Sequence, residues 1–184
     1  MIKKVILAVL AVIAVGVAVI CIAASRQPDQ FTVTRSATFN ATPERVFTQV
    51  NDFKNWSAWS PWEKLDPNMK KTVSDPSAGK GATYAWNGND DVGEGKMTIA
   101  ESHSSEYIKI DLEFLKPFAM KSDTNFTFKP EGDKTTMTWA MTGNHNFVSK
   151  VFCLFMDMDK MVGGDFEKGL ANLKPIVESG GTQQ

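Results

Sequence analysis

The sequence contains few of the residues that form disulfides and metal sites. It has two cysteines and two histidines among 184 residues. Cys21 lies within a long apolar run and Cys153 is the other cysteine, so no disulfide is expected inside the rest of the chain. Neither His103 nor His145 has the ligand spacing of a zinc or iron site. We therefore expect no metal, no cofactor and a fold that is held together by packing.

An excess of positive charge is also missing. Once Lys3 and Lys4 are set aside, 18 basic and 21 acidic residues leave a formal charge of −3. Proteins that bind nucleic acids normally carry a clear basic excess, so nucleic acid is not an expected partner.

Motifs of catalysis are scarce as well. No Ser-His-Asp or Cys-His arrangement stands out. The glycine-rich stretch "GNDDVGEG" (residues 88–95) lacks the lysine of a phosphate-binding loop, and its three acidic residues would repel phosphate. This stretch is interpreted as a hairpin turn.

The N-terminus, in contrast, carries a long apolar run. Residues 5–24 contain no charged side chain and, as an α-helix, would span roughly 30 Å, the thickness of a bilayer's hydrocarbon core. We expect residues 1–24 to form a single-pass membrane anchor with Lys3 and Lys4 in the cytoplasm and the rest of the chain exported. In a Gram-negative bacterium the exported domain would be periplasmic, and otherwise it would be extracellular.

A cleaved signal peptide is the alternative interpretation of this segment. Ala23, Ala24 and Ser25 offer small residues for cleavage, which would release a secreted periplasmic protein. An apolar core of about 7 to 15 residues is typical of signal peptides, and this run is longer, so an anchor is favoured. A lipid-modified Cys21 is disfavoured because the bulky Ile20 precedes it.

The remaining chain is divided into three parts. Residues 25–30 are polar and contain Pro28, which suits a tether. Residues 31–178 are expected to form one domain, and residues 179–184 a disordered tail.

Hydrophobic periodicity predicts an α+β domain. Residues 31–39 alternate as a strand, and Thr42 and Pro43 begin a short helix. Residues 69–142 read as successive antiparallel strands, the clearest being residues 107–114. Each strand has one apolar face, as in an antiparallel sheet that covers a single core.

The C-terminal region is predicted to form one long helix. Its apolar residues recur at helical spacing, and Asp159 falls on the same stripe. Gly163 and Gly164 indicate a bend or a close backbone approach. The apolar stripe comprises Phe152, Phe155, Val162, Phe166, Leu170, Leu173 and Val177.

This order of elements, together with four segments, resembles the polyketide cyclase/dehydrase and lipid-transport family of the START-like superfamily. The resemblance implies a helix-grip fold, in which a curved antiparallel sheet wraps around a long C-terminal helix and encloses an apolar cavity. Some members of the family cyclise or dehydrate polyketides, and others carry lipids or hormones. The segments are "ATPERVFTQVNDFKNWSAWSPW" (41–62), "GATYAWNGNDDVGEGKMTI" (81–99), "TTMTWAMTG" (135–143) and "MVGGDFEKGLANLK" (161–174).

Three of the five tryptophans, Trp56, Trp59 and Trp62, occur at intervals of three. If the short helix continues to about residue 58, Trp56 and Trp59 lie near one face and Pro61 ends the turn. These rings are expected mainly to fill the core, with at least one indole contacting a ligand as the alternative.

Further candidate ligand contacts project from the expected concave sheet face or the long helix. They are Tyr84, Trp86, Phe114, Trp139 and Phe155. A buried Asp159 would have a raised pKa and could orient a polar group of a ligand or act as an acid.

The resulting hypothesis is a membrane-tethered, non-enzymatic protein that binds or transports a hydrophobic small molecule or lipid in an internal cavity. The first alternative is a cyclase-like or dehydratase-like enzyme in which Asp159, His145 or Tyr84 transfers protons. The second is an interaction module that docks a partner protein through an exposed tryptophan patch.

Overall fold

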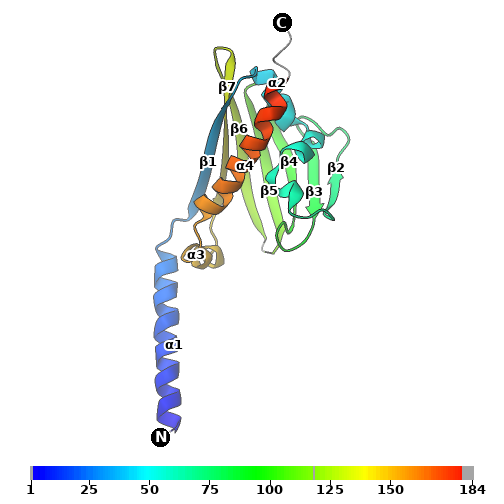
Figure 1. Ribbon diagram of the computed structural model, residues 1–184. Helices are drawn as coiled ribbons and strands as arrows, with labels where there is room; N and C mark the ends of the chain where they lie inside the picture. Colours follow the sequence, from blue (N-terminus) through cyan, green and yellow to red (C-terminus); the bar gives the residue numbers. More distant parts are fainter. Residues whose placement is uncertain (1, 118, 180–184) are drawn as a thin grey trace. The chain divides into compact units, whose positions relative to one another are not determined.

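The structure is a computed structural model that describes residues 2–117 and 119–179 (Figure 1). The expected tail, 179–184, lies outside the described residues beyond Ser179. The helices are α1 (Ile2–Ser25), α2 (Pro43–Asn51), α3 (Phe147–Cys153) and α4 (Met158–Glu178), with 3-10 helices η1 (Phe53–Ala58) and η2 (Pro61–Lys64). The strands are β1 (Gln30–Phe39), β2 (Lys70–Val73), β3 (Thr83–Asn87), β4 (Glu94–His103), β5 (Tyr107–Lys116), β6 (Met120–Glu131) and β7 (Lys134–Asn144).

Two compact units are formed by the described residues. The first contains residues 2–31 and 144–158, and the second contains residues 32–143 and 159–179. The segment 144–158 therefore clusters with the N-terminal helix.

Helix α1 matches the predicted apolar segment. Its 24 residues have a mean hydropathy of 3.3 over the most apolar part, so by length and composition it can cross a membrane. A signal sequence near an N-terminus has the same properties.

Within the described residues, the strands form one seven-stranded sheet in the order β1-β7-β6-β5-β4-β3-β2. Strands β2 to β7 pair in antiparallel register, and hydroxyl hydrogen bonds join Ser36 to Thr138 and Thr38 to Thr136 between β1 and β7. The predicted alternation is confirmed, because the inward residues from Ile108 to Leu112 on β5 and from Met137 to Met141 on β7 are buried, and Phe114 is half-buried. With α4 lying across this curved sheet, the molecule has the expected α+β helix-grip fold (Figure 1).

The short helix after β1 ends earlier than predicted. Helix α2 begins at Pro43 and buries Val46, Phe47 and Val50 as expected, but it stops at Asn51. Asp52 is extended, and its carboxylate accepts a hydrogen bond from the Lys54 N–H at the start of η1. The prediction that Pro61 ends the turn is also wrong, because Pro61 begins η2, where its fixed φ suits the first helical position.

The predicted long C-terminal helix is confirmed as α4, but it begins only at Met158 and does not include Phe152 and Phe155. The chain forms α3 and α4, and the break lies at residues 154–157 rather than at the glycines. Phe155 lies in this break, and its side chain is 73% exposed. Five residues of the stripe lie on α4: Phe166, Leu170, Leu173 and Val177 are buried, as expected, and Val162 is half-buried.

Gly163 provides the close approach that the sequence suggested. The guanidinium of Arg35 lies where a β-carbon at this position would be, so any larger side chain would displace it. Gly164 has open space around the same position. The need for glycine at residue 163 therefore arises from a neighbour on β1, and not from a bend in the helix.

Candidate functional site

Seven of the predicted ligand contacts belong to one continuous network of aromatic rings. Its centre is Trp139 on β7, whose ring stacks on Phe166 of α4 at a centroid separation of 4.0 Å. Trp59 and Trp62 meet Trp139 edge to face at 5.7 and 5.8 Å, and Trp56 lies 4.8 Å from Trp59. Offset-stacked and edge-to-face geometries are the favoured arrangements of aromatic pairs. The tryptophan segment thus packs between the sheet and α4.

A second arm of the network follows β3 and β5. Trp86 lies 6.2 Å from Tyr84 and 5.8 Å from Phe114, and Phe53 joins Tyr84 to Trp56. Gly95 on β4 makes this path possible, because a β-carbon there would overlap the indole of Trp86. Phe53 and Phe166 were not among the predicted site residues.

The 3-10 geometry of the tryptophan segment gives two indoles hydrogen-bond partners in the backbone. Trp56 Nε1–H donates to the Val50 carbonyl at 2.8 Å, and Trp59 Nε1–H donates to the Gln49 carbonyl at 3.2 Å. Both side chains are buried, and Trp62 is half-buried. The exposed tryptophan patch required by an interaction module is therefore not formed by these rings.

Trp139 differs from these indoles in an important respect. Its side chain is 2% exposed, and its Nε1–H has no hydrogen-bond partner among the residues that the structure describes. The Ser122 hydroxyl on β6 is in the same situation. An unpaired buried donor costs about 1 to 3 kcal/mol, so the indole of Trp139 would gain from an acceptor atom placed beside it. No local pattern in the sequence indicates this feature.

A polar group lies at the edge of the network, next to Tyr84. The Tyr84 hydroxyl donates to Glu63 Oε1 on η2 at 2.6 Å, and the other carboxylate oxygen of Glu63 pairs with Lys71. Burial first, and then the Glu63 carboxylate, raise the pKa of Tyr84 well above its ordinary value. Tyr84 therefore stays protonated at neutral pH and acts as a hydrogen-bond donor, which makes it a poor general base. Sequence reasoning missed Glu63, since nothing in "PWEK" marks it.

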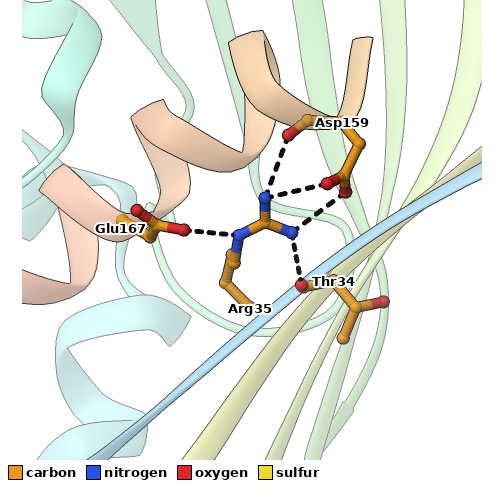
Figure 2. A network of polar contacts seen from close by, with 4 residues as sticks. All are labelled: Thr34, Arg35, Asp159 and Glu167. Atoms are coloured by element: carbon orange, nitrogen blue, oxygen red, sulfur yellow. Dashed lines mark hydrogen bonds and ion pairs between the residues drawn. The ribbon is translucent and has the colours of Figure 1, made fainter. Parts of the chain in front are cut away.

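Asp159 lies in an ion-pair network and not in a buried pocket (Figure 2). Arg35 of β1 donates to both Asp159 carboxylate oxygens at 3.0 Å and to Glu167 Oε1 at 2.6 Å. The Asp159 side chain is 58% exposed, so it is not the buried acid that a proton-transfer role would require. The two carboxylates raise the pKa of Arg35 above its already high value. The network fastens β1 to α4.

His145 lies in the first unit, in a shallow open hollow with Pro28, Asp29, Gln30 and Asn144. Its Nδ1 is 3.3 Å from the Ser149 hydroxyl, and its ring packs on Phe31 at 5.1 Å. Burial, and secondarily the charge of Lys150, lower the pKa of His145.

The three proton-transfer candidates are therefore engaged with three separate sets of partners. Tyr84 is bound to Glu63, Asp159 to Arg35, and the His145 ring lies beside Ser149. Within the described parts of the chain, no three histidine, cysteine, aspartate or glutamate side chains are grouped so that they could hold a metal ion.

Comparison with known proteins places this architecture among its relatives. The family model described as "Polyketide cyclase / dehydrase and lipid transport" matches residues 30–178. A search of curated proteins finds no match.

Several solved structures share the fold at low sequence identity. A protein from Chromobacterium violaceum is 16% identical with a TM-score of 0.58, and the similarity covers 83% of this chain and 99% of that one. The Aha1 dimer from Colwellia psychrerythraea is 14% identical with a TM-score of 0.60, covering 82% and 98% of the two chains. A protein from Nitrosospira multiformis is 20% identical with a TM-score of 0.58, covering 83% and 100%.

Proposed function

The chain belongs to the polyketide cyclase / dehydrase and lipid transport family, and from this premise we propose that it binds a hydrophobic small molecule or lipid at its aromatic network. Binding is non-covalent, and the protein is tethered to a membrane by α1. The ligand has an apolar body that packs on the rings and at least one acceptor oxygen.

The observation that carries this proposal is the unpaired indole N–H of Trp139 at the centre of the network. Apolar pockets with a few well-placed polar groups are typical of sites for small ligands. A ligand oxygen beside Trp139 would satisfy a donor that costs about 1 to 3 kcal/mol while it is unpaired. The surrounding rings would supply most of the apolar contact.

We also infer a route by which the ligand enters, and the packing around Trp139 supports it. Of the rings that touch Trp139, Trp59, Phe126 and Phe166 are buried, whereas Trp62 is half-buried. Trp62 lies on η2, a helix of only four residues. We expect Trp62 to swing outward and admit the ligand, because its displacement exposes the least additional apolar surface.

The short tether links this site to the bilayer. Four residues, Arg26 to Asp29, separate the end of α1 from the start of β1. Even fully extended at about 3.5 Å per residue they reach only roughly 15 Å, so an uncleaved α1 keeps the binding unit beside the lipid. Apolar molecules could then enter the protein directly from the membrane.

The family also contains cyclases and dehydratases, but an enzymatic role has less support. Tyr84, Asp159 and His145 each contact different side chains and do not meet in one site. The raised pKa of Tyr84 also keeps its hydroxyl protonated. Binding without chemical change is the function that these side chains favour.

Mass spectrometry of molecules that co-purify with the full chain tests the binding proposal. We expect a defined apolar molecule with an acceptor oxygen on the wild type, and much less of it on a Trp139→Phe variant. Trp56→Phe is the matched control, because it removes an indole N–H that already has a protein partner. Retention by Trp139→Phe at the wild-type level, or a wild type carrying only bulk membrane lipid, would overturn the proposal.

Membrane fractionation tests the tether separately. The native protein should remain in membranes after a carbonate wash and keep Lys3 and Lys4, whereas a chain that begins at Gln27 should be soluble and folded. A mature N-terminus at Ser25 in soluble extract would show that α1 is a cleaved signal sequence.

A further inference from the structure

The first unit carries an apolar surface that the proposed ligand site does not use. Five large side chains between residues 147 and 156 are 41–73% exposed, which is unusual for so short a segment. We call these residues the α3 patch. They are Phe147, Val148, Phe152, Phe155 and Met156.

The α3 patch is continuous because the chain keeps turning after α3 ends. The N–H groups of Phe155 and Met156 both bond to the Phe152 carbonyl. Val148, Phe152 and Phe155 are therefore spaced as neighbours on one side of a helical turn.

Charge is almost absent from this segment. Lys150 is the one charged residue in 147–156, and its ammonium pairs with Asp29 within the same unit. This pairing with Lys150 lowers the pKa of Asp29, so the pair is ionised and mutually neutralised at neutral pH. The patch consequently presents apolar side chains without an unpaired charge among them.

The neighbour of α3 is the end of the apolar N-terminal helix. Helices α1 and α3 lie side by side in the first unit (Figure 1). Ala24 is the one fully buried residue in the described part of α1, and it lies in the last turn of that helix. The contact with α3 thus falls at the end of α1 that is followed by the tether.

We propose that the α3 patch inserts into the interfacial layer of the same bilayer that α1 crosses. At about 1.5 Å per residue, the 24 residues of α1 are roughly 36 Å long, slightly more than a hydrocarbon core of about 30 Å. The last turn of α1 therefore lies at the boundary between acyl chains and headgroups, and α3 lies beside it. Phenylalanine, valine and methionine side chains on a short helix are suited to this layer.

Arg26 supports this placement. It is exposed and directly follows α1, where a guanidinium can bind lipid phosphates while the apolar side chains of α3 enter the membrane. The inference rests on the proposed membrane tether, but it adds a second contact with the lipid. Because α3 follows β7 and α1 precedes β1, the membrane would hold the chain before the start of β1 and after the end of β7, and not by α1 alone.

Spin-label accessibility of the full chain tests the inference. The protein, carrying Cys21→Ser and Cys153→Ser, is reconstituted in vesicles of phosphatidylethanolamine and phosphatidylglycerol. One nitroxide is attached at Phe155→Cys, with Val148→Cys as a second position in the patch. The reference positions are Val15→Cys within α1 and Asp133→Cys in the turn between β6 and β7, which is exposed in the second unit.

We expect labels at residues 155 and 148 to collide several-fold more with oxygen, relative to a water-soluble nickel complex, than the label at residue 133. The label at residue 15 should be the most lipid-exposed. If residue 15 is in lipid while both patch positions remain open to nickel, the inference falls and the tether stands. If residue 15 is also open to nickel, the tether and the inference fall together.

A second copy of the chain is the other possible cover for the α3 patch. Labels at residue 155 of two copies would then broaden each other's spectra, and the broadening would persist on dilution with lipid. This result would show that the α3 patch contacts a second copy, and it would overturn the membrane inference.

Discussion

A comparison of two tryptophan substitutions measures the cost of the unpaired donor at the centre of the network. Trp139→Phe and Trp56→Phe remove the same atoms from side chains that are 2% and 3% exposed. The losses of apolar contact and the cavities left behind are therefore similar. The two variants differ in one hydrogen bond, because Trp56 Nε1–H binds the Val50 carbonyl and the Trp139 indole has no partner in the described structure.

The expected difference in free energy of unfolding between the two variants follows from this one hydrogen bond. Trp56→Phe removes a buried hydrogen bond and leaves the Val50 carbonyl without its indole donor, which costs about 1 to 3 kcal/mol. Trp139→Phe instead removes an unpaired donor and recovers about 1 to 3 kcal/mol. We expect Trp139→Phe to be the more stable of the two variants by about 2 kcal/mol or more.

Urea unfolding of the full chain in mild detergent, followed by far-ultraviolet circular dichroism after removal of bound ligand, provides the measurement. If the free energy of unfolding depends equally steeply on urea concentration in the two variants, their unfolding midpoints can be compared directly. If Trp139→Phe is as unstable as Trp56→Phe or more so, the Trp139 N–H has a partner in the ligand-free protein and the reasoning is refuted. Adding back the purified ligand should stabilise the wild type and Trp56→Phe, but not Trp139→Phe.

Three further predictions concern the surroundings of the network. Gly163→Ala should lower the unfolding temperature because the new methyl group displaces Arg35, whereas Gly164→Ala should raise the free energy of unfolding by up to about 1 kcal/mol. Equal changes of the unfolding temperature in the two variants, measured by thermal unfolding, would contradict this. Burial, and then the charge of Lys150, lower the pKa of His145 in the folded protein. As the pH falls, the unfolded chain therefore takes up a proton first, and the free energy of unfolding should fall below about pH 6.5. The urea midpoint should depend less on pH in the His145→Gln variant. The pKa of Tyr84 is raised, so stability should decline above about pH 10 and Tyr84→Phe should weaken that decline, which a series of alkaline urea titrations would show.

The sequence by itself determined the elements whose signals are local. The uncharged N-terminal run predicted α1, and the alternation in residues 107–114 predicted which face of β5 is buried. Pro43 predicted the start of α2. Backbone preference and side-chain periodicity act over a few residues, so they can be read without knowledge of any distant neighbour.

Only the tertiary structure decided which of the candidate side chains meet and what they bind. Asp159 is ion-paired because it meets Arg35, which lies 124 positions away along the chain, and Phe155 is exposed in the break between α3 and α4. The unpaired indole of Trp139 is likewise a property of its whole surroundings, in which rings and not acceptor atoms occupy the space beside it. Burial and hydrogen-bond satisfaction depend on contacts between segments that are remote in sequence, so periodicity could name the rings but not the donor left among them.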